Sequence, residues 1–191
     1  MKKPVIFVVI CVAAVSLAAA SSVFLSAQET HREVAHPAAN PAEDTRPNSD
    51  QVPDVYAISG QVQRIVLLRF KYKTDLLAGL EKMVKQEKIR NAVILSGVGS
   101  VRDYQLHQVA NREFPIKDVV VKNPTGPAGI VGMSGVVIGG RVHAHIVLAN
   151  ADKAFGGDLE TNTTVYTFAI VTLGVLDDGV DLSKVDDRSY R

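Results

Sequence analysis

The alternation of apolar and polar residues along the first part of the chain predicts strands around one helix. Residues 55–70, VYAISGQVQRIVLLRF, alternate with the two-residue period of a strand and are interpreted as two strands about a turn at Gly60. Residues 73–90 are predicted to form a helix that Thr74 caps at its N-terminus. The helix carries an apolar stripe at three- and four-residue spacing, formed by Leu76, Leu77, Leu80, Met83 and Val84.

Three further strands are predicted behind the helix. NAVILSGVGSV (91–101) is typical of a buried strand that ends in a tight turn at its two glycines, Gly97 and Gly99. DYQLHQVA (103–110) and DVVVK (118–122) have the composition of the next two strands. The glycine segment lacks the lysine of a phosphate-binding loop and the full dinucleotide fingerprint, so no nucleotide cofactor is expected.

The last part of the chain predicts a hairpin and a final strand. Residues 129–151 are apolar on both sides of a Gly139-Gly140 pair, which suits the two-residue turn of a hairpin. Residues 164–176 form the final apolar strand. About seven strands and one helix, with no strand–helix–strand repetition, predict an α+β domain over residues 54–180 with a mainly antiparallel sheet.

The amino-terminal residues 1–27 have the pattern of a secretory signal peptide. Two lysines precede an apolar run from Val5 to Ala20, and small residues that suit cleavage follow it. The alternative is a membrane anchor, because the run approaches the roughly 20 residues that span a bilayer. We expect cleavage, which predicts a secreted or periplasmic protein that is not held at a membrane.

Residues 28–53 are expected to be a disordered linker, and residues 181–191 a polar tail. The linker contains four of the eight prolines and almost no large apolar side chains, so it cannot bury enough surface to fold. His31 and His36, which lie in it, are expected to be solvated. The single cysteine, Cys11, is in the leader, and the mature chain is therefore expected to have no disulfide bonds.

The charge of the chain argues against a nucleic-acid partner. The whole chain carries 21 basic and 20 acidic residues, for a net charge of +1. Removal of the leader takes two lysines and no acid, so the net charge becomes −1. A protein that neutralises several phosphates usually has a basic excess.

Two histidines one residue apart are the clearest candidates for chemistry. On a strand, positions i and i+2 face the same side, so His143 and His145 should project together. Zinc takes at least three protein ligands, and Asp158, after Gly156-Gly157, is the candidate third ligand. His107 is a candidate fourth ligand. The alternative is that these histidines are structural residues with ordinary hydrogen bonds.

Three segments of the chain together resemble a known family. Residues 74–106, 140–160 and 163–176 are similar, in order and spacing, to the plant and prokaryote conserved domain, also called domain of unknown function 296. The resemblance covers roughly residues 58–178. It implies a mostly antiparallel sheet with flanking helices, and a homotrimer.

The resemblance also bears on the histidines. Family members usually have H-A-H followed by G-G-H-L, and these histidines are candidate metal ligands. The first two correspond to His143 and His145, but Asp158 stands where the third histidine is expected. A carboxylate binds zinc too, and it also suits iron or manganese.

These observations leave three functional hypotheses. The first is a secreted trimer that binds a divalent metal or a small ligand at His143, His145 and Asp158; whether it is an enzyme is not decided by the sequence. The second is DNA binding, the label that bacterial members of the family often carry, although the Arg-Gly-Arg-Pro hook of the plant members is absent here. The third is a structural oligomerisation module without metal.

Overall fold

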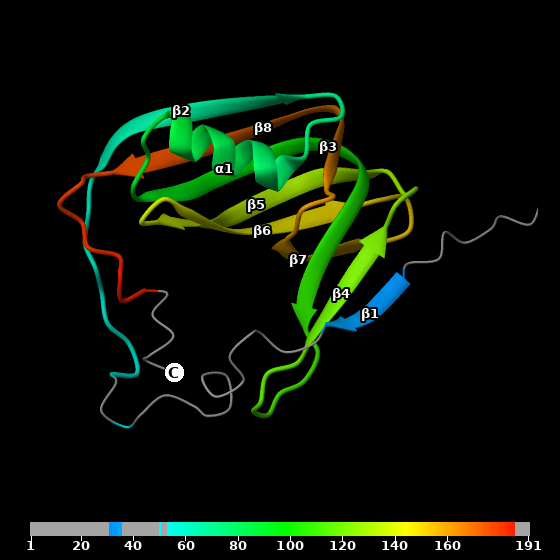
Figure 1. Cartoon of the computed structure of the whole chain (residues 1–191), viewed down its shortest axis with the longest axis horizontal. Coiled ribbons are helices and arrows are strands. Elements are labelled where there is room, and N and C mark those ends of the chain that lie inside the picture. Colours follow the sequence, from blue (N-terminus) through cyan, green and yellow to red (C-terminus); the bar gives the residue numbers. More distant parts are fainter. Residues whose placement is uncertain (1–30, 36–49, 51–52, 186–191) are drawn as a thin grey trace, which may run out of the picture.

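The computed structural model describes residues 31–35, 50 and 53–185, which form one sheet and one helix (Figure 1). The predicted signal peptide, most of the linker and residues 186–191 lie outside the described residues. The helix α1 spans Leu76–Gln86. The strands are β1 (His31–Ala35), β2 (Val62–Lys71), β3 (Ala92–Val109), β4 (Asp118–Asn123), β5 (Ala128–Ile138), β6 (Arg141–Ala149), β7 (Ala154–Leu159) and β8 (Thr164–Leu176).

The sheet is antiparallel throughout and is organised around the long strand β3. The amino-terminal half of β3 pairs with β5 on one side and β8 on the other, and β8 pairs in turn with β2. The carboxyl-terminal half pairs with β4 and, through Leu106 and His107, with β7. Because β7 also pairs with β6, and β6 with β5, the strands β3, β5, β6 and β7 form a closed ring.

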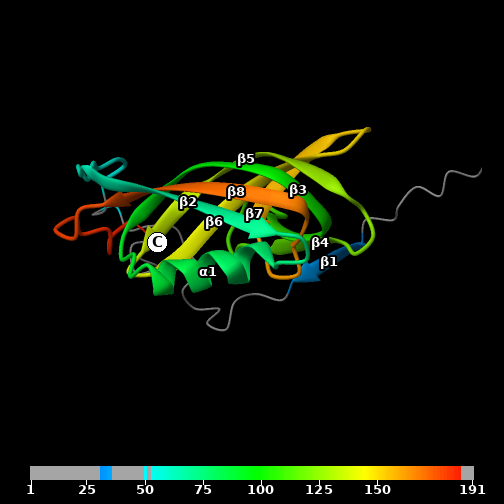
Figure 2. The same cartoon turned by 90° about the horizontal axis from the view of Figure 1, so that it is seen from above.

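The helix packs its apolar stripe against the core between α1 and the sheet (Figure 2). Leu76, Leu80 and Val84 are buried, in agreement with the predicted spacing. The N-cap is Asp75, not Thr74, because the Asp75 carboxylate accepts a hydrogen bond from the Ala78 amide at 2.9 Å. No helix of the described residues is long and apolar enough to cross a membrane.

The predicted glycine turn after residue 96 is wrong, since Gly97 and Gly99 lie inside β3. At Gly99 the backbone has φ +139°, and a Cβ there would lie 2.2 Å from the Phe168 carbonyl oxygen. Glycine therefore allows β8 to approach β3 at an irregularity in their register. The two strands predicted on either side of this point are one continuous strand.

Other differences lie at the ends of the domain and in its helices. Residues 55–61 form no strand, so the predicted turn between two strands at Gly60 is absent. His31–Ala35, inside the predicted linker, pairs with β4 as β1. The flanking short helices that the resemblance implied are not found, because α1 is the sole α-helix of the residues that the structure describes.

The hairpin between β5 and β6 is confirmed, and the carboxyl-terminal segment packs beside it. Gly139 and Gly140 have φ +57° and +83°, as a two-residue hairpin turn requires. The buried Asn91 side chain accepts a hydrogen bond from the Gly139 amide and donates one to the Val180 carbonyl. Val180 and Leu182 pack with Ile138, so the start of the predicted polar tail belongs to the fold.

Candidate metal centre

Neighbouring strands place the candidate residues in one row across the sheet. In the strand register, Asp158 on β7 lies opposite His145 on β6 and opposite His107 on β3. Residues directly opposite each other in an antiparallel sheet share a face, so these three side chains are neighbours. His143, two residues before His145, lies on the same face of β6. The pairing of β7 with both β6 and β3 thus assembles the site.

The glycine pair before Asp158 explains how β7 fits between its neighbours. A Cβ on Gly156 would lie 2.6 Å from the Ile146 carbonyl oxygen on β6, and one on Gly157 would lie 2.3 Å from the His107 carbonyl oxygen on β3. The Gly156-Gly157 pair is therefore not a flexible connection between elements. It forms part of strand β7, and a side chain at either glycine would clash with the backbone of a neighbouring strand.

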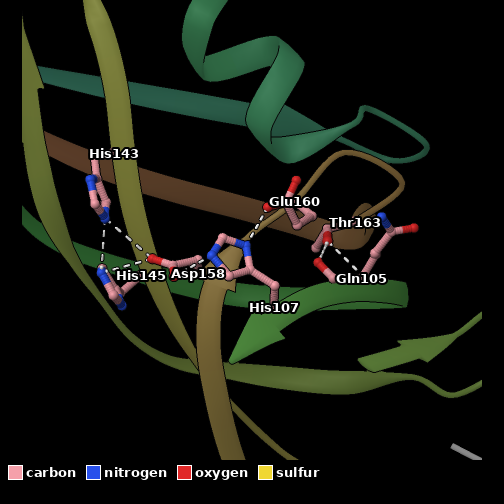
Figure 3. Close-up of polar contacts among 7 residues, drawn as sticks. All are labelled: Gln105, His107, His143, His145, Asp158, Glu160 and Thr163. Carbon is pink, nitrogen blue, oxygen red and sulfur yellow. Dashed lines mark hydrogen bonds and ion pairs between the residues drawn. The ribbon is translucent and has the colours of Figure 1, made fainter. Parts of the chain in front are cut away.

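Three ligand atoms converge at the centre of this row (Figure 3). The Nε2 atoms of His143 and His145 are 3.2 Å apart. Asp158 Oδ1 lies 3.3 Å from the His143 nitrogen and 2.8 Å from the His145 nitrogen. The imidazole rings are stacked, with 15° between their planes. The two histidines are about half exposed and the carboxylate is mostly buried.

Asp158 Oδ1 is buried and has no hydrogen-bond partner, although two imidazole nitrogens lie close to it. Both contacts have ion-pair distances but lack the orientation of a hydrogen bond. A buried carboxylate oxygen without a donor is costly, so it normally has a partner. A cation between the three atoms would supply that partner.

The spacing of the three atoms fits a divalent ion. With bonds of about 2.1 Å, neighbouring ligand atoms are separated by about 3.4 Å around a tetrahedral ion and about 3.0 Å around an octahedral ion. The observed separations of 2.8, 3.2 and 3.3 Å lie close to these values, and two of them fall between the octahedral and the tetrahedral separation. The three residues together fit zinc, iron or manganese, and they leave coordination positions open to water or to a ligand.

His107 lies behind Asp158 and does not belong to the group of three converging atoms. Its Nε2 contacts the other carboxylate oxygen, Asp158 Oδ2, at 2.7 Å. Its Nδ1 is 2.5 Å from Glu160 Oε1. The imidazole therefore links two carboxylates, an arrangement that orients Asp158 in the way an outer group orients a metal ligand.

Glu160 also belongs to this group of polar side chains, although the sequence did not indicate it. Its backbone amide donates to the Gln105 carbonyl at 3.1 Å, and the buried Thr163 hydroxyl donates to the same carbonyl at 3.0 Å. These bonds fix the segment after β7 against β3 (Figure 3). The spacing of two residues from Asp158, near the end of a strand, is the one signal that could have suggested Glu160.

The hydrogen bond to Glu160 raises the pKa of His107 above its usual value, and the charge of Asp158 adds to this effect while burial opposes it. A raised folded-state pKa means that protonated His107 stabilises the fold. This contribution is fully present below the unfolded pKa of about 6.5 and is lost as the pH rises through the folded-state pKa.

We therefore expect His107 in the metal-free protein to titrate above the usual histidine range, measured by NMR. Glu160→Gln should lower that pKa, because the largest cause of the shift loses its charge. As the pH rises above about 6.5, the melting temperature of the wild type should fall more than that of this variant, because the variant has less stabilisation from protonated His107 to lose. A His107 pKa at or below that of a free histidine would contradict this interpretation.

A cavity of about 840 Å³ opens beside the site. Its lining includes His107, His143, Asp158 and Glu160 on one side and residues of α1 on the other. The volume lies within the range of small-molecule sites. Two of the three candidate ligands, His143 and Asp158, thus border a space that a small molecule can enter.

The fold and this site define a class: an antiparallel α+β domain with a candidate metal centre on one face of its sheet. The family model of the Plants and Prokaryotes Conserved (PCC) domain matches residues 57–177, and the chain belongs to this family. This confirms the resemblance seen in the sequence. No curated protein matches the chain significantly.

Solved structures share the fold. A metal-containing protein from Archaeoglobus fulgidus is 23% identical, with a TM-score of 0.56 over 66% of this chain and 89% of its own. A hypothetical protein from Salmonella enterica is 23% identical, with a TM-score of 0.52 over 63% and 81% of the two chains. A plant- and prokaryote-conserved protein from Pyrococcus horikoshii is 23% identical, with a TM-score of 0.52 over 68% and 87%.

Proposed function

We propose that the domain binds one divalent metal ion through His143, His145 and Asp158. The observation that carries the proposal is the buried Asp158 Oδ1, which has no hydrogen bond and lies beside two imidazole nitrogens at ligand spacing. A protein of similar fold from Archaeoglobus fulgidus is described as metal-containing, which supports the proposal. Zinc, iron and manganese are the candidate ions, because the ligands combine imidazole and carboxylate.

A bound ion should stabilise the protein. At a free metal concentration about 100 times the dissociation constant, the gain is about 2.7 kcal/mol, or roughly 10 °C in the melting temperature of a domain of this size. We expect this difference between melts in excess zinc, iron(II) or manganese and melts in chelator. Identical melting temperatures with every ion and with chelator would favour the alternative of structural histidines.

An exposed apolar surface on the sheet supports self-association. Ile65 and Leu67 on β2 are 50% and 68% exposed, and they point away from the buried Leu68 and Phe70. Other exposed apolar residues project from neighbouring strands: Leu95 and Val98 on β3, Val131 on β5, Val147 on β6, and Tyr166 and Phe168 on β8. Apolar surface on several adjacent strands is typical of an interface. We propose that copies of the chain associate through it as a homotrimer.

A charge placed on this surface should dissociate the oligomer. We expect wild-type protein to have about three times the mass of one chain by light scattering, and Leu67→Glu with Val131→Glu to have the mass of one, because a carboxylate is costly to bury at an interface. Lys82→Glu on α1 changes charge elsewhere and is the control. A monomeric wild type would contradict the proposal.

We further propose that the domain acts outside the cytosol, as the signal-peptide pattern of residues 1–27 indicates. DNA binding is the weaker hypothesis for a mature chain with a net charge of −1. Open coordination positions would allow the ion to polarise a substrate or activate water.

A further inference from the structure

The cavity beside the metal site has basic residues at a distance from the metal ligands. Lys85 and Lys88, from the last turn of α1 and the residues after it, line the cavity together with Arg141 at the start of β6. The hairpin turn lies against this end of the helix, since the Gly140 amide donates to the Arg90 carbonyl at 2.8 Å. Three cationic side chains are therefore brought to one end of the cavity by two separate elements.

Strand β6 relates this basic end to the metal ligands. Arg141, His143 and His145 occupy alternate positions of β6, and all three are exposed. Alternate residues of a strand share a face and are about 6.6–6.8 Å apart along it. A molecule bound at the ion could thus extend along β6 to the basic residues within a few bond lengths.

The wall between the two ends is apolar. Leu77 and Val84 of α1 and Ile89, which follows the helix, contribute to it. A surface of this kind accommodates a hydrocarbon segment and offers no partner to a polar one. The ligand chemistry favoured by the cavity is therefore polar at both ends and apolar between them.

The acidic residues of the lining do not cancel the positive charge once an ion is present. Asp158 would bind the ion, and Glu160 is paired with His107. Glu81 and Asp118 are the remaining carboxylates of the lining. With a divalent ion bound, the three cationic side chains and the ion outweigh the four carboxylates of the lining, and this excess of positive charge favours an anion.

We propose that the cavity binds a small aliphatic dicarboxylate, with one carboxylate on the metal ion and the other at Lys85, Lys88 and Arg141. The inference rests on the proposed metal site and adds the class of ligand to it. The apolar wall contacts the hydrocarbon chain of the ligand, and the two charged ends of the cavity set its length.

Calorimetry on the metal-loaded full chain tests the proposal with succinate, glutarate and acetate as probes. At least one diacid should bind about tenfold or more tightly than acetate, because only a diacid reaches both ends. Lys85→Gln with Lys88→Gln should reduce the diacid affinity to about that of acetate and leave the metal content unchanged. Lys82→Gln, on the same helix but outside the cavity lining, should bind like the wild type.

Equal affinities for acetate and both diacids would overturn the proposal, as would a double glutamine variant that binds the diacids like the wild type. Metal content, measured on the same samples, distinguishes a failure of the proposed ligand class from a failure of the proposed metal site. A metal-loaded protein that does not prefer diacids contradicts only the ligand class. A protein that takes up no metal contradicts the metal site and, with it, this inference.

Discussion

Alanine at both His143 and His145 should lower the affinity of the chain for zinc, iron(II) or manganese by more than about 100-fold. Loss of a group that merely orients a ligand typically costs 10–100-fold, and here two of three ligands are removed. Both side chains are about half exposed, so their removal should change the metal-free melting temperature little. Competition with a metal indicator in solution measures the affinity.

His107→Gln is the matched comparison for this variant. His107 contacts Asp158 Oδ2 and not the converging atoms, so its replacement should weaken metal binding by about 10–100-fold without abolishing it. A double alanine variant that binds metal as tightly as the wild type would place the ion elsewhere. A His107 variant as defective as the double variant would make His107 a ligand itself.

Gly135→Ala should lower the free energy of unfolding by about 3 kcal/mol or more, measured by urea denaturation in the presence of chelator. Gly135 on β5 has φ +140°, where a side chain is strained. A Cβ at this position would lie 2.1 Å from the His143 carbonyl oxygen and 2.9 Å from the Ala144 Cα. To relieve the clash, β6 would have to move at His143, which is a candidate metal ligand.

Gly132→Ala is the control, since it lies on the same strand and a Cβ there would have no atom within 4 Å. We expect it to change stability by less than about 1 kcal/mol. The Gly135 variant should also bind metal more weakly, because His143 would be displaced. Equal stability of the two variants would show that β5 and β6 are not as close as described.

The sequence predicted those features that depend on local periodicity. The alternation of β6 placed His143 and His145 on one face, and the structure brings their Nε2 atoms to 3.2 Å. The paired glycines at 139 and 140 predicted the hairpin turn, and the apolar stripe predicted the buried face of α1. In each case, residues close in sequence determine the geometry.

What the sequence could not predict depends on which strands are neighbours. Asp158 was a candidate because an acid follows two glycines, but its strand was not predicted, since AFGGDL has little of the β-branched composition of a strand. β7 exists because its glycines fit between β6 and β3. The same pairing places His107 beside Asp158 and Glu160 beside His107, which no local pattern reveals.

The most direct test of the central claim is the metal content of the purified chain. Protein incubated separately with zinc, iron(II) and manganese, then freed of loose metal on a desalting column, is analysed for bound metal per chain. We expect about one ion per chain for at least one of these metals, and almost none in the variant with alanine at both histidines. Wild-type protein that retains no more of any metal than this variant would contradict the claim.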